Sequence, residues 1–173
     1  MTGLDQDGTR GGALRSKFVA LRTWLSGFPF SILQLGLRVG VGSVFFKAGL
    51  LKLNSWEMTV MLFREEYKVP VLPPETAATM AMYQELTIPV LLFLGLATRV
   101  ATVPLLGMIT VIQLFVYPNA WNDHLLWGSA LVLLMTRGPG VFSVDHLIER
   151  AVAGRATNPQ AGGLAPRHGT PAG

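Results

Sequence analysis

Three basic residues lie inside one long apolar stretch of this sequence. Residues 31–53, SILQLGLRVGVGSVFFKAGLLKL, contain Arg38, Lys47 and Lys52. A stretch of about 20 apolar residues is long enough to cross the hydrocarbon core of a bilayer. A charge near the centre of such a helix costs about 2.5–3.5 kcal/mol on insertion scales. A buried cation in this segment therefore needs a carboxylate partner.

Glu85 is the acid that lies inside another apolar segment. Tyr83 and Gln84 precede it, and Pro89 follows one helical turn later. Because proline has no N–H, the backbone carbonyl of Glu85 loses its helical hydrogen bond. A carboxylate beside a free carbonyl is a candidate site for a proton, a cation or a polar ligand, and a packed kink is the alternative interpretation.

Helix geometry predicts which cation faces Glu85. With residues 53 and 75 at the outer surface, a rise of about 1.5 Å per residue places Lys47 about 9 Å deep, Glu85 about 15 Å and Arg38 about 22 Å. Arg38 and Lys47 are nine residues apart and lie on opposite sides of a helix, so both cannot face Glu85. We expect an Arg38–Glu85 pair, since guanidinium and carboxylate can form two parallel hydrogen bonds. Lys47 is the alternative partner.

Lys52 shares the Arg38 face and lies at the outer rim, where its ammonium can reach the headgroups. A proton path, or a pocket for a quinone or another small substrate, would use such a cluster. A purely structural ion pair is the alternative, and no pattern assigns a catalytic residue. The candidate buried polar site consists of Arg38, Lys47, Lys52, Tyr83, Gln84, Glu85 and Arg99.

Composition argues against several other chemistries. The chain has no cysteine, which excludes disulfides, thiolate zinc sites and thiolate-bound iron–sulfur clusters within it. His124 lies at a helix start, His146 beyond the last apolar segment and His168 in the tail, so we do not expect a haem. Asp123 and His124 are too few for a metal site. The basic residues form no single stripe, and we expect no nucleic-acid partner.

The apolar segments predict an all-α membrane protein, a bundle of four transmembrane helices with flanking amphipathic interfacial helices. Charged residues make up 14% of the 173 residues, against about 25% in soluble domains. The short turn at 97–99 makes the second and third spans antiparallel neighbours. The membrane domain is expected at 30–149, with spans at about 31–53, 75–96, 100–117 and 122–137.

A second interfacial helix is expected at about 55–68, between the first two spans. Four of its residues follow a 4, 3, 4 spacing that places them on one helical face. This face is a candidate outer docking surface for a membrane or periplasmic protein partner. It consists of Trp56, Val60, Phe63 and Tyr67.

The two ends of the chain are expected to lie in the cytoplasm. Residues 14–29 have an apolar face flanked by arginines and predict an amphipathic interfacial helix, with a cytosolic cap as the alternative. The glycine-rich residues 1–13 and the proline- and glycine-rich residues 150–173 predict disorder. Basic residues concentrate beside both ends, so the positive-inside rule predicts a multi-pass protein of the inner (plasma) membrane with both termini cytoplasmic.

Several motifs occur together in the order of a known family. Arg38, FKAGLLKL at 46–53, Glu85, GLATR at 95–99 and RGPG…SVDH at 137–146 resemble the DoxX family. The resemblance covers about residues 31–149 and implies a bacterial inner-membrane protein with four spans. The family takes its name from a subunit linked to a thiosulfate:quinone oxidoreductase. This resemblance implies an accessory membrane subunit of a redox-linked system, with quinone as the candidate cofactor. The family-motif turn consists of Gly138, Pro139, Gly140 and Asp145.

Residues 62–74 also resemble a DoxX subgroup encoded beside small secreted metal-binding peptides. This implies an alternative role as a non-catalytic membrane partner, or as a transport component for small solutes or metal-binding peptides. Because the chain has no cysteine, it carries no thiol chemistry of its own, and we do not expect an enzyme without partners. The sequence leaves a homo-oligomer open.

Overall fold

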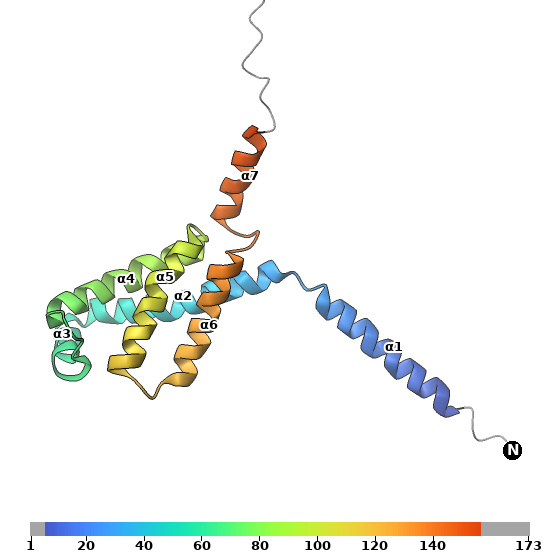
Figure 1. The fold of residues 1–173 in the computed structure, drawn as a ribbon, viewed down its shortest axis with the longest axis horizontal. Coiled ribbons are helices and arrows are strands. Elements are labelled where there is room, and N and C mark those ends of the chain that lie inside the picture. Colours follow the sequence, from blue (N-terminus) through green and yellow to red (C-terminus); the bar gives the residue numbers. More distant parts are fainter. Residues whose placement is uncertain (1–5, 157–173) are drawn as a thin grey trace, which may run out of the picture. The chain divides into compact units, whose positions relative to one another are not determined.

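The computed structural model describes residues 6–156 and is all-helical there. The chain divides into two compact units, residues 1–30 and 31–173, and each is described by itself. The elements are α1 (Gln6–Ser26), α2 (Phe30–Asn54), α3 (Trp56–Leu62), the π-helical turn η1 (Phe63–Tyr67), α4 (Pro74–Leu94), α5 (Thr98–Val111), the π-helical turn η2 (Ile112–Val116), α6 (Trp121–Arg137) and α7 (Val144–Ala156) (Figure 1).

Helix α1 begins at Gln6, inside the stretch for which the glycines predicted disorder. Extending an existing helix costs little per residue, so the helix predicted from residue 14 continues toward the N-terminus. Helix α7 likewise reaches Ala156, inside the predicted C-terminal tail. The rest of the two predicted tails, residues 1–5 and 157–173, lies outside the described residues.

Three helical segments are long and apolar enough to cross a membrane: α2, α4 and the continuous helix Thr98–Val116, formed by α5 and η2. The protein is therefore a multi-pass helical membrane protein. Helix α6 has 17 residues and is shorter than these three. Four spans were predicted, and length and composition support three of them.

Proline and glycine determine where the spans turn. Pro74 stands in the first turn of α4, where the missing N–H costs nothing. Gly95 ends α4 in the left-handed conformation, with φ of +66°. A Cβ at Gly95 would clash with the Arg38 guanidinium and lie 2.5 Å from the Ser143 Cβ. Glycine thus allows the close α4–α5 turn that the sequence predicted.

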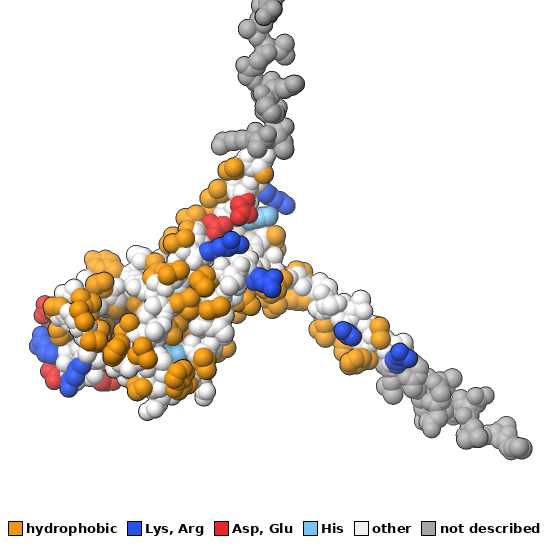
Figure 2. Space-filling model, in the orientation of Figure 1, with side chains coloured by type: hydrophobic (Ala, Val, Ile, Leu, Met, Phe, Trp, Pro, Cys, Tyr) orange, Lys and Arg blue, Asp and Glu red, His pale blue; other side chains and the backbone are white. Residues whose placement is uncertain are grey.

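The core lies between α2, α4, α5 and α6. Its buried members include Phe45, Leu92, Leu105 and Leu131. On the outside of the same helices many large apolar side chains are exposed, and Figure 2 shows them over much of the visible surface. Charged side chains gather at the end that carries α3. An apolar outer surface of this extent is what lipid contact requires.

Candidate functional site

A cavity of about 630 Å³ lies among helices α2, α4, α5 and α6. This volume is within the range of about 300–1,000 Å³ that is typical of small-molecule sites. On α5 its lining residues Pro104, Gly107, Met108 and Val111 follow the spacing i, i+3, i+4, i+7, so one helical face forms the wall. Helix α4 contributes a face with the same spacing, and so does the start of α6 together with Ala120 before it. Helix α2, the turns η1 and η2 and the loop before α4 complete the wall.

The walls are mostly apolar, and a few polar groups face the cavity between them. Met80 is 57% exposed and Tyr117 45%, so the cavity reaches the surface of the protein. Its polar and charged lining residues are Lys52, Tyr67, Gln84, Glu85, Tyr117, Asp123 and His124.

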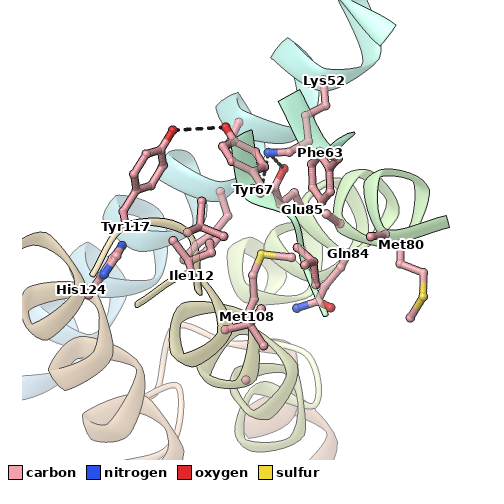
Figure 3. Close-up of a pocket in the computed structure, with 18 of the residues that line it drawn as sticks. Lys52, Phe63, Tyr67, Met80, Gln84, Glu85, Met108, Ile112, Tyr117 and His124 are labelled. Atoms are coloured by element: carbon pink, nitrogen blue, oxygen red, sulfur yellow. Dashed lines mark hydrogen bonds and ion pairs between the residues drawn. The ribbon is translucent and has the colours of Figure 1, made fainter. Parts of the chain in front are cut away.

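An ion pair between α2 and α4 forms part of the cavity wall (Figure 3). Lys52 Nζ lies 2.9 Å from Glu85 Oε1 and 2.7 Å from Oε2. The two side chains are 18% and 5% exposed. Glu85 is thus the buried acid that the sequence indicated, but its partner is Lys52. The predicted Arg38–Glu85 pair and the Lys47 alternative are both wrong.

The packing of Gly49 explains this pairing. A Cβ at Gly49 would lie 3.0 Å from both the Cβ and the carbonyl carbon of Glu85, so the two helices approach closely there. Gly49 stands five residues before the end of α2, whereas Glu85 stands eleven residues after the start of α4. The prediction had placed the two outer ends at one height. The observed offset brings Lys52 within reach of Glu85.

Arg38 lies in a separate group of residues, which we call the turn cluster: Gln34, Arg38, Gly95, Gly138, Gly140, Ser143 and Asp145. Its guanidinium is fully buried, and Nη2 donates to the Phe142 carbonyl. Its Nε and Nη1 have no hydrogen-bond partner. Among the described residues, Arg38 forms no ion pair.

The family-motif turn holds this cluster together. The Asp145 carboxylate accepts hydrogen bonds from the backbone N–H groups of Ala97, at 2.7 Å, and Thr98, at 3.0 Å. The Asp145 N–H donates to the Gly95 carbonyl at 3.0 Å. Asp145 thereby caps the start of α5 from a distant part of the chain. Gly138, Pro139, Gly140 and Asp145 do not line the cavity, and their contacts are structural.

The remaining predicted polar residues divide between the cavity and the outer surface. Gln84 lines the cavity, and its Nε2 donates to the Pro104 carbonyl at 2.6 Å. Lys47, Tyr83 and Arg99 are exposed and line no part of it.

Three of the four residues of the predicted outer docking surface pack against α4. Phe63 is 7% exposed and packs with Ala77 of α4, and Val60 and Tyr67 pack against the same cluster. Trp56 alone of the four stays exposed. The amphipathic face was correctly recognised, and most of it packs against α4 beside the cavity.

Two tyrosines join the π-helical turns at the edge of the cavity. The Tyr117 hydroxyl lies 3.4 Å from the Tyr67 hydroxyl and 3.1 Å from Glu66 Oε1, and the two rings pack edge to face. The hydrogen bond with Tyr67, followed by burial and the nearby charge of Glu66, raises the pKa of Tyr117.

His124 is a cavity residue that the sequence did not indicate. It is 6% exposed, its Nδ1 lies 2.5 Å from Gln113 Oε1, and its ring packs beside Trp127. The available signal was the spacing of Ala120, Asp123, His124 and Trp127 on one face of α6. Within residues 6–156, no group of three or more His, Cys, Asp or Glu side chains could hold a metal ion.

These features define a multi-pass helical membrane protein with a cavity inside its bundle. The sequence model of the DoxX family matches residues 33–118, so this chain contains a DoxX family domain. The matched region runs from α2 to the end of η2 and includes the Lys52–Glu85 pair. It ends before α6 and the family-motif turn.

A protein of Haemophilus influenzae described as uncharacterized is 27% identical to this chain over 136 residues. That match covers 73% of this chain and 89% of the relative. No solved structure matches the chain significantly.

Proposed function

We propose that this protein is an accessory membrane subunit of a redox-linked system and that it binds a lipid-soluble quinone in its cavity. The observation that carries the proposal is an apolar cavity of about 630 Å³ whose wall contains the buried Glu85 paired with the partly buried Lys52. Lipid quinones combine an apolar ring and tail with two carbonyl oxygens. The DoxX domain is the reason for preferring a redox-linked role over other uses of such a ligand.

The cavity residues match the parts of such a molecule. Two aromatic side chains, Phe45 and Trp127, lie in its wall with their ring centroids 6.1 Å apart and can pack against a flat ring. The Lys52 ammonium has three N–H donors. It donates at most two of them to the two oxygens of Glu85. One donor is then free for a quinone carbonyl. Apolar walls with a few placed polar groups are typical of cofactor sites.

A variant that fills the cavity tests this proposal. Gly107 lines the cavity, and a Cβ placed there meets no atom within 4 Å. The substitution Gly107→Leu therefore has room for its Cβ and directs the rest of the side chain toward the cavity space. Gly128→Leu is the matched control, because Gly128 in α6 also meets no atom within 4 Å but does not line the cavity.

The full chain is purified in mild detergent, and its solvent extract is assayed for quinone by mass spectrometry. The wild type and Gly128→Leu should retain quinone, and Gly107→Leu should retain at least tenfold less. Equal quinone in all three, or none in any, would contradict the proposal. If the protein is instead a transport component without a redox role, vesicles that contain it should take up solute, and Gly107→Leu should abolish this uptake.

We also propose that α6 crosses the membrane as a fourth span, so that both termini lie in the cytoplasm. Seventeen residues of helix extend about 26 Å, close to the hydrocarbon thickness, and Trp121 is suited to the interface. Helices α1 and α3 would then lie in the two interfaces of the inner membrane. Because the chain has no cysteine, single-cysteine variants report topology without background.

Asn119→Cys should react with an impermeant maleimide in spheroplasts, and Glu149→Cys only after the membrane is opened. Equal labelling of both variants in intact spheroplasts would contradict the proposal that α6 crosses the membrane. The reverse labelling would invert the orientation.

A further inference from the structure

His124 is held in one tautomer by its hydrogen bonds. Gln113 Nε2 lies 2.7 Å from the Pro118 carbonyl oxygen, which can only accept. The amide nitrogen of Gln113 must therefore face Pro118, and its Oε1 faces His124 Nδ1 at 2.5 Å. Since Oε1 also only accepts, the proton lies on Nδ1. In the neutral imidazole, Nε2 is then an acceptor with a free lone pair.

Within the described part of the chain, this acceptor has no hydrogen-bond partner. Among residues 6–156, no hydrogen bond reaches His124 Nε2. The atom is also not one of the fully buried polar atoms that lack a hydrogen-bond partner, so it remains accessible. The ring lines the cavity together with Asp123, whose carboxylate also accepts. The α6 wall therefore offers acceptors to a ligand, whereas Lys52 on α2 offers a donor. In Figure 3, Ile112 and Met108 are drawn between His124 and the Lys52–Glu85 pair.

We propose that the cavity selects a head group that carries a hydroxyl donor, which hydrogen-bonds to His124 Nε2. This inference rests on the proposed binding of a quinone-type amphiphile and specifies its redox form. A quinol has two hydroxyl donors, whereas a quinone has two carbonyl oxygens that only accept. A carbonyl facing Nε2 would bring two lone pairs together and leave both without a hydrogen bond. The reduced quinol is therefore the preferred occupant.

Affinity for matched ligands tests the preference. The full chain in nanodiscs is titrated anaerobically with a decyl-quinol, the corresponding decyl-quinone and the dimethyl ether of the quinol. Binding is followed by the quenching of tryptophan fluorescence, to which Trp127 in the cavity wall contributes. The quinol should bind about fivefold more tightly than the quinone, which corresponds to one hydrogen bond. The dimethyl ether, which has no donor, should lose this advantage.

The variant His124→Phe keeps a flat ring and removes the acceptor. We expect it to bring the quinol-to-quinone affinity ratio to about one by weakening the quinol alone. His146→Phe is the matched control, since His146 lies in α7 and does not line the cavity, and it should keep the fivefold ratio. A ratio of one in the wild type, or an unchanged ratio in His124→Phe, would overturn the inference while the cavity still binds quinones. Absence of binding by every ligand would overturn the proposed function as well.

A direct measurement reads the tautomer in the wild-type protein and uses the variants only to assign the signals. Nitrogen NMR of histidine-labelled wild-type protein distinguishes the two neutral tautomers, and the three histidines are assigned with the His124→Phe and His146→Phe variants. We expect the Nδ1–H tautomer for His124. The Nε2–H tautomer would make it a donor to the cavity and reverse the predicted preference.

Discussion

Two cations on one face of α2, one fully buried and one partly buried, have different surroundings. Lys52 is paired with Glu85 and lines a cavity that reaches the protein surface. Arg38, fourteen residues earlier, is fully buried in the turn cluster, where it donates to a backbone carbonyl. Both cost free energy to bury, but only Lys52 has open space and an ionic partner beside it. The adjoining cavity is therefore what makes Lys52, and not Arg38, a candidate for ligand binding.

The first prediction concerns the turn cluster. Gly95→Ala places a Cβ against the Arg38 guanidinium and 2.5 Å from the Ser143 Cβ, at a φ of +66°. We expect the free energy of unfolding to fall by about 3 kcal/mol or more, measured by thermal unfolding in detergent. Gly36→Ala, where a Cβ meets no atom within 4 Å, is the control and should keep or slightly raise stability. Equal melting temperatures of the two variants would show that the turn cluster does not stabilise the fold.

The second prediction concerns the ion pair beside the cavity. Glu85→Gln leaves the Lys52 ammonium without its counter-charge, and we expect a loss of about 3 kcal/mol in stability together with loss of quinone. The double variant Lys52→Met/Glu85→Leu replaces both charges with apolar groups. Its stability should return to near the wild-type value, whereas quinone binding should stay lost. If the double variant binds quinone normally, the pair is only a structural contact, like Arg38.

The third prediction is smaller and concerns the tyrosines at the edge of the cavity. Because the pKa of Tyr117 is raised, folded protein holds this proton more tightly than unfolded protein does. This contribution to stability is complete below the ordinary tyrosine pKa of about 10 and is lost as pH rises beyond it. Tyr117→Phe should flatten the decline in stability above about pH 10, measured by unfolding at a series of pH values. Tyr83→Phe, at an exposed site outside the cavity, should leave the decline unchanged.

The helical elements could be predicted closely from the sequence. The predicted spans at 31–53 and 75–96 correspond to Phe30–Asn54 and Pro74–Leu94. Apolar length, Pro74 in the first turn of α4 and the short turn after Gly95 are local properties, so they require no knowledge of packing. The same local logic identified Glu85 as the acid of a buried polar site.

The partner of Glu85 and the acceptor at His124 depend on packing between distant segments. Lys52 was included in the candidate site but placed at its outer rim and not opposite Glu85, because the relative height of two helices cannot be read from either one. His124 sits at a helix start, and only its contact with Gln113 on η2 fixes its tautomer and makes it a cavity acceptor.

The sequence by itself indicated the main apolar helices and an acid buried among them. The tertiary structure decided which cation neutralises that acid and where space for a ligand remains. The physical reason is that hydropathy and helix breaking act within a few turns of one chain segment. The close approach of Gly49 to Glu85, by contrast, is a property of two helices together.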